Sequence, residues 1–139
     1  MSDSSEIDNA LVAKLGSDLV LLSLMPNGVY MDESPPGSTR FVIVSLLFAA
    51  DEPVFGGRGY EDALYLVKAV ALSTVGADMK AAAARIDVLL EDGDLVVPGY
   101  SHMAMFREER IRHTERDERD SSIRWYHRGG HYRVQQAVI

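Results

Sequence analysis

The sequence predicts an α+β fold, a largely antiparallel β-sheet with two main α-helices packed on one face. Three observations predict this class. Residues 4–15 and 74–92 have the apolar spacing of amphipathic helices, residues 40–49 form an apolar strand, and strand-like stretches fill the C-terminal third. At 139 residues, the chain is expected to form one domain, 1–139.

The first expected helix covers residues 4–15, where Ile7, Leu11 and Leu15 recur at i, i+4 and i+8. Gly16 then ends the pattern. The elements expected next are a short helix over 18–24 capped by Ser17, a turn over 26–28, a strand over 29–31 and a loop over 32–39.

Residues 40–49 (RFVIVSLLFA) are apolar on both strand parities, which predicts that both faces of this strand are covered. One face can meet the helices, and a neighbouring subunit could cover the other. Residues 51–59 (DEPVFGGRG) are expected to be a loop with Phe55 near its tip. An apolar tip residue either tucks back onto its own domain or contacts a partner.

The segment 60–72 (YEDALYLVKAVAL) fits two patterns. Tyr60, Leu64 and Val67 have helical spacing, whereas Leu64, Leu66 and Leu72 share one strand parity, so the pattern leaves helix and strand open. Residues 74–92 form the strongest helix prediction, with Ser73 or Thr74 as its cap and Gly93 at its end. Its buried stripe is expected to be Met79, Ala83, Ile86 and Leu90.

The C-terminal third predicts a strand over 95–97, a long strand over 102–116, an exposed turn over 117–121 and a last strand that returns antiparallel to 102–116. That last strand holds the only Trp, Trp125, and a glycine pair, Gly129-Gly130, in its middle. The pair is either a two-residue hairpin turn or a bulge that bends one long strand. Large aromatic and cationic side chains suit a surface that meets another protein better than a catalytic pocket.

Charge is unevenly distributed along the chain. Residues 1–100 carry 6 Lys and Arg against 15 Asp and Glu, whereas residues 101–139 carry 8 Arg against 6 Asp and Glu, and the total is −7. An acidic body with an Arg-bearing end fits two interpretations, a solvated face whose charges compensate one another and a surface for charge-complementary self-association. A nucleic-acid interface usually has a basic patch without interspersed acids, and here the arginines alternate with Glu108, Glu109 and Glu115.

The sequence lacks the residue patterns of several kinds of catalytic and metal-binding site. The chain has no Cys, and its four His have no clear third ligand, so neither a metal nor another cofactor is expected. No G-x-S-x-G elbow is present, and the loop residues 56–59 lack the ending of a phosphate loop. Glu108 and Glu109 should point to opposite faces of a strand, a poor acid–base pair. We therefore expect no enzyme, and neither a secretory signal nor a membrane span.

Four stretches together resemble the tail-completion, or tail-terminator, proteins of long-tailed bacteriophages and prophages. They are YLVKAV (65–70), RIDVLL (85–90), GYSHM (99–103) and, above all, HRGGHYRV (127–134). The order of elements is similar over nearly the whole chain. The resemblance implies that residues 60–72 are a strand, and it implies a ring, usually a hexamer, that caps the finished tail tube and joins it to the head.

Such a ring implies three partners: other copies of the chain, the tail tube protein and the head–tail connector or stopper protein. The place of action would be the tail–neck junction of the virion, with the host cytoplasm as the site of assembly. No membrane and no sequence-specific nucleic acid is implied, although DNA can pass through the ring. Because the family offers no active-site residues, the candidate interface residues are chosen by residue type: Phe55, Trp125, Arg128 and His131.

Two other classes of protein compete with this reading. A head–tail adaptor or a tail tube subunit would belong to the same particle. A small α+β enzyme or ligand-binding domain would instead use the His residues, and it would need a convergent pocket with perturbed titratable groups.

Overall fold

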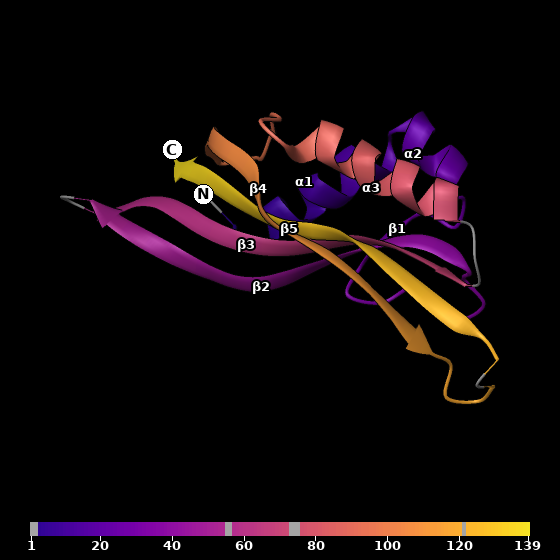
Figure 1. The fold of residues 1–139 in the computed structure, drawn as a ribbon. Coiled ribbons are helices and arrows are strands. Elements are labelled where there is room, and N and C mark those ends of the chain that lie inside the picture. Colours follow the sequence, from indigo (N-terminus) through magenta and orange to yellow (C-terminus); the bar gives the residue numbers. More distant parts are fainter. Residues whose placement is uncertain (1–2, 55–56, 73–75, 121) are drawn as a thin grey trace.

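The computed structural model describes residues 3–54, 57–72, 76–120 and 122–139, and it has two layers, a twisted β-sheet and a group of helices on one of its faces (Figure 1). This arrangement confirms the α+β class. The elements in chain order are α1 (Ser5–Gly16), α2 (Leu19–Leu24), β1 (Val29–Met31), β2 (Arg40–Val54), β3 (Gly57–Leu72), α3 (Gly76–Leu90), β4 (Tyr100–Arg116) and β5 (Arg124–Val138).

The sheet has the strand order β1-β2-β3-β5-β4. Three of its pairings are antiparallel, and only the short β1 runs parallel to β2. The two hairpins overhang the helices in different directions, β2–β3 at one end of the molecule and β4–β5 at the other (Figure 1). The sheet therefore reaches well beyond the layer that covers it.

The main core lies between the helices and one face of the sheet. The predicted stripe of α1, namely Ile7, Leu11 and Leu15, is buried there. On α3 the buried residues are Met79, Ala82, Ile86 and Leu90, so Ala82 takes the place expected for Ala83. Every second residue of β3 from Ala63 to Ala71 is at most 1% exposed, which is the alternation of a strand with one covered face.

Polar contacts fix α2 against α3. Asp18, and not Ser17 as predicted, caps α2, because its carboxylate accepts a hydrogen bond from the Leu21 amide at 2.9 Å. The same carboxylate pairs with both Nε and Nη2 of Arg85 on α3, at 2.8 and 2.7 Å. This bidentate pair holds the pKa of Asp18 below its usual range.

Two sequence predictions about irregular segments are wrong. Residues 51–59 are not a loop throughout, since β2 continues to Val54 and β3 begins at Gly57. Pro53 is tolerated because no strand of the described residues pairs with the outer side of β2 there, so that a missing N–H costs no ladder bond. Residues 95–97 are not a strand, although Leu95 and Val97 are buried from an extended connection between α3 and β4. The expected caps Ser73 and Thr74 lie outside the described residues.

Segment 60–72 belongs to β3, as the family resemblance implied and the pattern alone could not decide. The glycine pair is not a hairpin turn, because Gly129 and Gly130 lie in the middle of β5, paired with Lys68 and Val67 on one side and with β4 on the other. A Cβ on Gly129 would lie 2.1 Å from the carbonyl oxygen of Val67. Neighbouring backbone therefore passes where any side chain would stand.

The irregularities of the β4–β5 ladder are on β4, where the register shifts between His102 and Ala104 and again between Arg107 and Glu109. The second shift is a bulge at Glu108, and it overturns the prediction that Glu108 and Glu109 point to opposite faces. Glu108 pairs with Arg133 and Glu109 with His131, and those two residues of β5 share one face.

Candidate functional site: the open face of the sheet

We call the side of the sheet away from the helices the open face. The strand alternation of β5 places Trp125, His127, His131 and Arg133 on it, opposite the even-numbered residues of β3. The residue types that a protein interface favours therefore gather on the face that no helix covers.

A small second core forms at one end of the open face. Phe41, Ile43 and Val70 are buried there, and Tyr30 and Trp125 pack against them. The Phe41 and Trp125 rings meet edge to face, with centroids 6.2 Å apart. The Trp125 indole N–H donates to Asp117 at 3.1 Å, so the ring is held by both ends.

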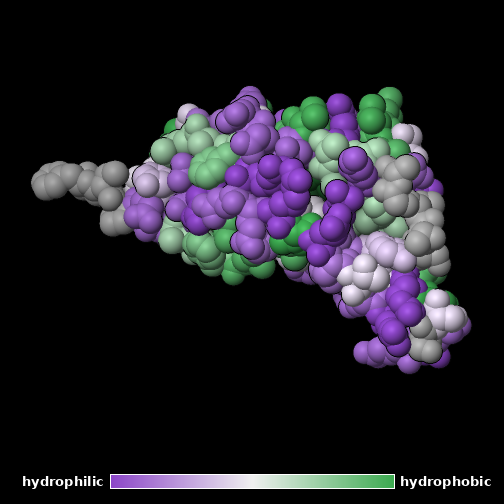
Figure 2. Space-filling model, in the orientation of Figure 1, coloured by the Kyte–Doolittle hydropathy of each residue, from purple (hydrophilic) through white to green (hydrophobic). Residues whose placement is uncertain are grey.

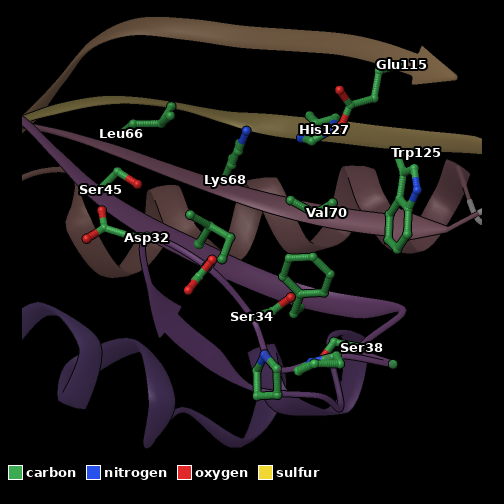
Figure 3. Close-up of a pocket in the computed structure, with 16 residues that line it drawn as sticks. Asp32, Ser34, Ser38, Ser45, Leu66, Lys68, Val70, Glu115, Trp125 and His127 are labelled. Atoms are coloured by element: carbon green, nitrogen blue, oxygen red, sulfur yellow. Dashed lines mark hydrogen bonds and ion pairs between the residues drawn. The ribbon is translucent and has the colours of Figure 1, made fainter. Parts of the chain in front are cut away.

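Beside this cluster is a groove of about 480 Å³ between the loop 32–38 and the sheet. Lys68, His127 and Glu115 lie along its sheet side, and Ser34 and Ser38 lie on the loop opposite (Figure 3). Burial lowers the pKa of the Lys68 ammonium, while the charge of Glu115 acts in the other direction. The groove thus combines apolar walls with a partly desolvated cation.

His127 is the most buried titratable side chain of this groove, at 7% exposed. Its Nε2 lies 2.7 Å from Glu115 Oε1, and since an ionised carboxylate only accepts, Nε2 carries the proton in the neutral ring. Nδ1 is then a buried acceptor without a hydrogen-bond partner among the described residues. His113 stacks on the ring at 4.2 Å, and burial and Lys68 lower the pKa of His127.

At the middle of the open face, Arg133 joins three strands. Its Nη1 lies 3.0 Å from Asp62 on β3, its Nε pairs with Glu108 on β4, and its guanidinium lies 5.3 Å from the centre of the Phe48 ring on β2. The guanidinium holds the pKa of Glu108 below its usual range. This cluster gives the open face a fixed, charged centre.

An apolar strip lies along β2 at a bulge at Leu47. Leu46 pairs with Tyr65 on the helix side, and Phe48 pairs with Leu64 on the open face. Leu46, Leu47 and Phe48 are 42%, 45% and 46% exposed. Figure 2 shows hydrophobic surface along this lower side of the molecule. We call these three residues the β2 ridge.

The β2 ridge also lies on an open edge of the sheet. β1 pairs with β2 only from Val42 to Val44, and in the described chain no strand pairs with that side of β2 from Ser45 onward. An apolar edge with unpaired backbone groups is a surface that a partner strand can extend. Both faces of 40–49 are covered within the chain from Phe41 to Val44, whereas the β2 ridge is exposed, and its cover by a neighbouring subunit stays a prediction.

No protein-family model matches the chain, and no curated protein matches it. Among solved structures, a chain of the virion of a native gene transfer agent particle superposes with a TM-score of 0.72, at 23% identity over 96% of each chain. The two chains share a fold. A second solved structure superposes with a TM-score of 0.58, at 13% identity over 100% of this chain and 97% of its own. At these identities the likeness is one of fold.

The structure places the four candidate interface residues in different surroundings. Trp125 and His131 are both on the open face, but Arg128 is on the helix side, where it lines a groove against α3. Phe55 lies outside the described residues. Strand parity alone could have separated Arg128 from Trp125 and His131, since their positions differ by an odd number of residues. Their role in an interface remains a prediction.

The sequence pattern indicated the apolar strand 40–49 that holds the β2 ridge, but it did not single out Arg133 or Lys68. Arg133 and Lys68 could have been found only with the strand pairing in hand, because their partners are distant in sequence. Within the described ranges, no group of three His, Asp or Glu side chains is placed to hold a metal ion. Across the same residues, no helix is both long enough and apolar enough to cross a membrane.

Proposed function

We propose that this chain is a structural protein of a phage-like virion, which caps the completed tail tube as a ring and forms part of the head–tail joining interface. The observation that carries the proposal is the fold shared with a virion chain over 96% of both lengths. The open face, the open edge of β2 and the overhanging hairpins support it, because each is contact surface that the isolated chain leaves unsatisfied.

A ring also explains why the surface is asymmetric. Head-to-tail contacts join two different patches of each subunit, and they close into a ring when the rotation between neighbours allows it. The chain offers such unlike patches in the apolar β2 ridge and in the charged cluster around Arg133. The proposed partners are further copies of the chain, the tail tube protein and the connector or stopper protein, at the tail–neck junction after assembly in the host cytoplasm.

The test is the solution mass of the purified chain, measured by light scattering across protein and salt concentration. A discrete species of about six chains supports the ring. Open-ended polymers would instead indicate a tail tube subunit, and a mass of one chain at every concentration would contradict self-assembly. The variant Phe48→Ser should weaken the assembly, whereas Leu19→Ser, at an exposed site on α2, should leave it unchanged.

A second candidate function, a ligand-binding domain, is favoured by one observation only. The groove beside Trp125 combines apolar walls with Lys68 and the unpartnered Nδ1 of His127. If this groove served a small molecule, Lys68→Met would abolish binding of that ligand without changing the solution mass of the chain. The virion fold and the exposed β2 ridge favour the structural function.

A further inference from the structure

A second groove, of about 350 Å³, lies on the helix side of the sheet between α3 and the strands β4 and β5. We call it the cationic groove. Its walls carry four cationic side chains and one lining acid, Asp87, and Glu91 approaches one end by accepting a hydrogen bond from the Arg107 amide. The cations are Lys80, Arg107, Arg110 and Arg128.

Ion pairing in the groove differs from that of three other arginines, although Arg112 and Arg116 on β4 also have no ion pair among the described residues. Arg40, Arg85 and Arg133 each have an acidic partner within 3.0 Å. In the groove only Arg107 is paired, with Asp87 at 3.0 Å, and Asp87 is further engaged by the Tyr132 hydroxyl at 2.9 Å. Within the described ranges, Lys80, Arg110 and Arg128 have no ion pair.

Three cations without an acidic partner repel one another on this concave surface. The groove is therefore a local positive site on a chain whose net charge is −7. The groove also has an apolar wall, formed by Ala83, Ala84 and Val88, and Val88 is 67% exposed. Its chemistry therefore suits a segment that carries carboxylates together with an aliphatic side chain.

The chain itself contains a segment of that chemistry. After α3 ends at Leu90, Asp92 and Asp94 are exposed, and Val96 is 84% exposed beside them. The segment follows the C-terminus of α3, where the helix dipole adds negative potential. We call residues 92–96 the acidic turn. Neither Asp92 nor Asp94 has an ion pair among the described residues.

The acidic turn cannot enter the cationic groove of its own chain. Lys80, Ala84 and Val88 line the groove along α3, and the turn begins beyond the end of that helix. Within the turn Leu95 is buried in the main core, and none of residues 92–96 lines the groove, so the turn is fixed outside the groove of its own chain. A contact between the two patches must therefore join different copies.

We propose that the acidic turn of one copy docks in the cationic groove of the next, with Asp94 between Arg110 and Arg128 and with Val96 against the aliphatic wall of α3. The contact is head-to-tail, because the two patches differ, and it can therefore repeat around a ring. As a description of the ring's subunit contact, the inference rests on the proposed function. The docking of two copies can nevertheless be tested by itself.

Site-directed cross-linking tests the docking directly, because the chain has no Cys. Two single variants, Ala84→Cys and Val96→Cys, carry different affinity tags and are mixed under mild oxidation. We expect the mixed disulfide to exceed either same-site disulfide at least tenfold. In a parallel mixture Arg116→Cys, at the far end of β4, replaces Ala84→Cys, and it should give no excess. No excess of the 84–96 product would overturn the docking.

Charge exchange gives an independent test. Arg128→Glu and Asp94→Arg should each raise the concentration for half-assembly at least tenfold, and the chain that carries both should return to within threefold of the unmodified one. Arg116→Glu makes the same charge change as Arg128→Glu outside the groove and should have little effect. Failure of the double variant to recover, while it unfolds at the normal denaturant concentration, would contradict the proposed pairing.

The two proposals fail in different ways. A ring of about six chains without the 84–96 cross-link would retain the terminator function and exclude this contact. The 84–96 cross-link in a species of two chains would retain the contact and exclude the ring.

Discussion

The two faces of the sheet are formed by the same strands with the same alternation of side chains, yet helices cover one face and leave the other open. Tyr65, Val67 and Tyr132 face the helices and are at most 1% exposed. Their neighbours in sequence, such as Leu66 and Arg133, point to the open face and are only partly buried. Both faces belong to the same strands, so the difference in side-chain burial comes from the layer of helices on one side. A face rich in aromatic and aliphatic groups without that layer is a surface prepared for a partner.

The largest expected effect tests the covered face. Ile86→Ala on α3 removes a side chain that is 0% exposed in the main core, and large-to-small changes at such sites cost about 2–5 kcal/mol. Urea unfolding should show the loss as a lower midpoint. Val88→Ala, two residues along the same helix at 67% exposure, should change the unfolding free energy by less than about 0.5 kcal/mol.

The next effect tests the strand that both faces share. Gly129→Ala places a methyl group 2.1 Å from the Val67 carbonyl oxygen and 2.5 Å from the Lys68 Cα, so β5 must shift away from β3. Overpacking of this kind costs about 1–3 kcal/mol or prevents folding. Gly16→Ala is the matched control, because its added methyl would meet only Val29 at 4.0 Å. Equal stability of the two variants would refute the close approach of the strands.

A smaller effect is expected from the charged centre of the open face. Arg133→Gln removes the group that joins Asp62, Glu108 and the Phe48 ring, and partly exposed ion pairs contribute about 1 kcal/mol or less. The loss should shrink as salt is raised, because screening weakens the pairs in the unmodified chain. Arg116→Gln at the far end of β4 should be neutral. A larger loss for Arg116→Gln would mean that the charges of the hairpin end matter more than the cluster.

The smallest effect concerns pH. Burial lowers the pKa of His127 in the folded chain, while the unfolded chain has the usual value of about 6.5, so the unfolded state binds more protons between the two values. Stability should therefore fall as the pH is lowered through about 6.5. Lys68 and His113 oppose protonation, and Glu115 favours it. His127→Phe keeps an aromatic ring against His113 and removes the titration, so its stability should fall less between pH 8 and pH 5; parallel curves would contradict this assignment.

Regular elements were predictable because their patterns depend on local sequence. The stripe Ile7, Leu11 and Leu15 marks α1, and the alternation around Trp125 marks β5. The strand ends within residues 51–59 were not predictable from the local sequence, because Pro53 and the glycines favour a loop. Only the long pairing with β3 extends β2 as far as Val54. The face of the sheet to which Glu108 points could not be predicted either, because the bulge depends on pairing with the partner strand and not on the residue itself.

The candidate surface was only partly predictable for the same reason. Residue type pointed to Trp125 and His131, and the fold places both on the open face. Residue type alone could not place Arg128 against α3, because that requires knowing which face the helices cover. The β2 ridge was visible as an apolar run, but its exposure depends on where the three helices end.

The short length of β1 has a consequence for how the protein can be stored before it assembles. β1 pairs with only three residues of β2. Among the described residues, most of the outer edge of β2 therefore has backbone N–H and C=O groups without a partner strand, beside exposed apolar side chains. Any second strand of suitable pattern can satisfy it, including the same strand of another copy in the wrong orientation. Correct and incorrect association then compete, and both accelerate with concentration. Unassembled chains should therefore avoid incorrect association longest when their concentration is low and when assembly removes them as fast as they are synthesised.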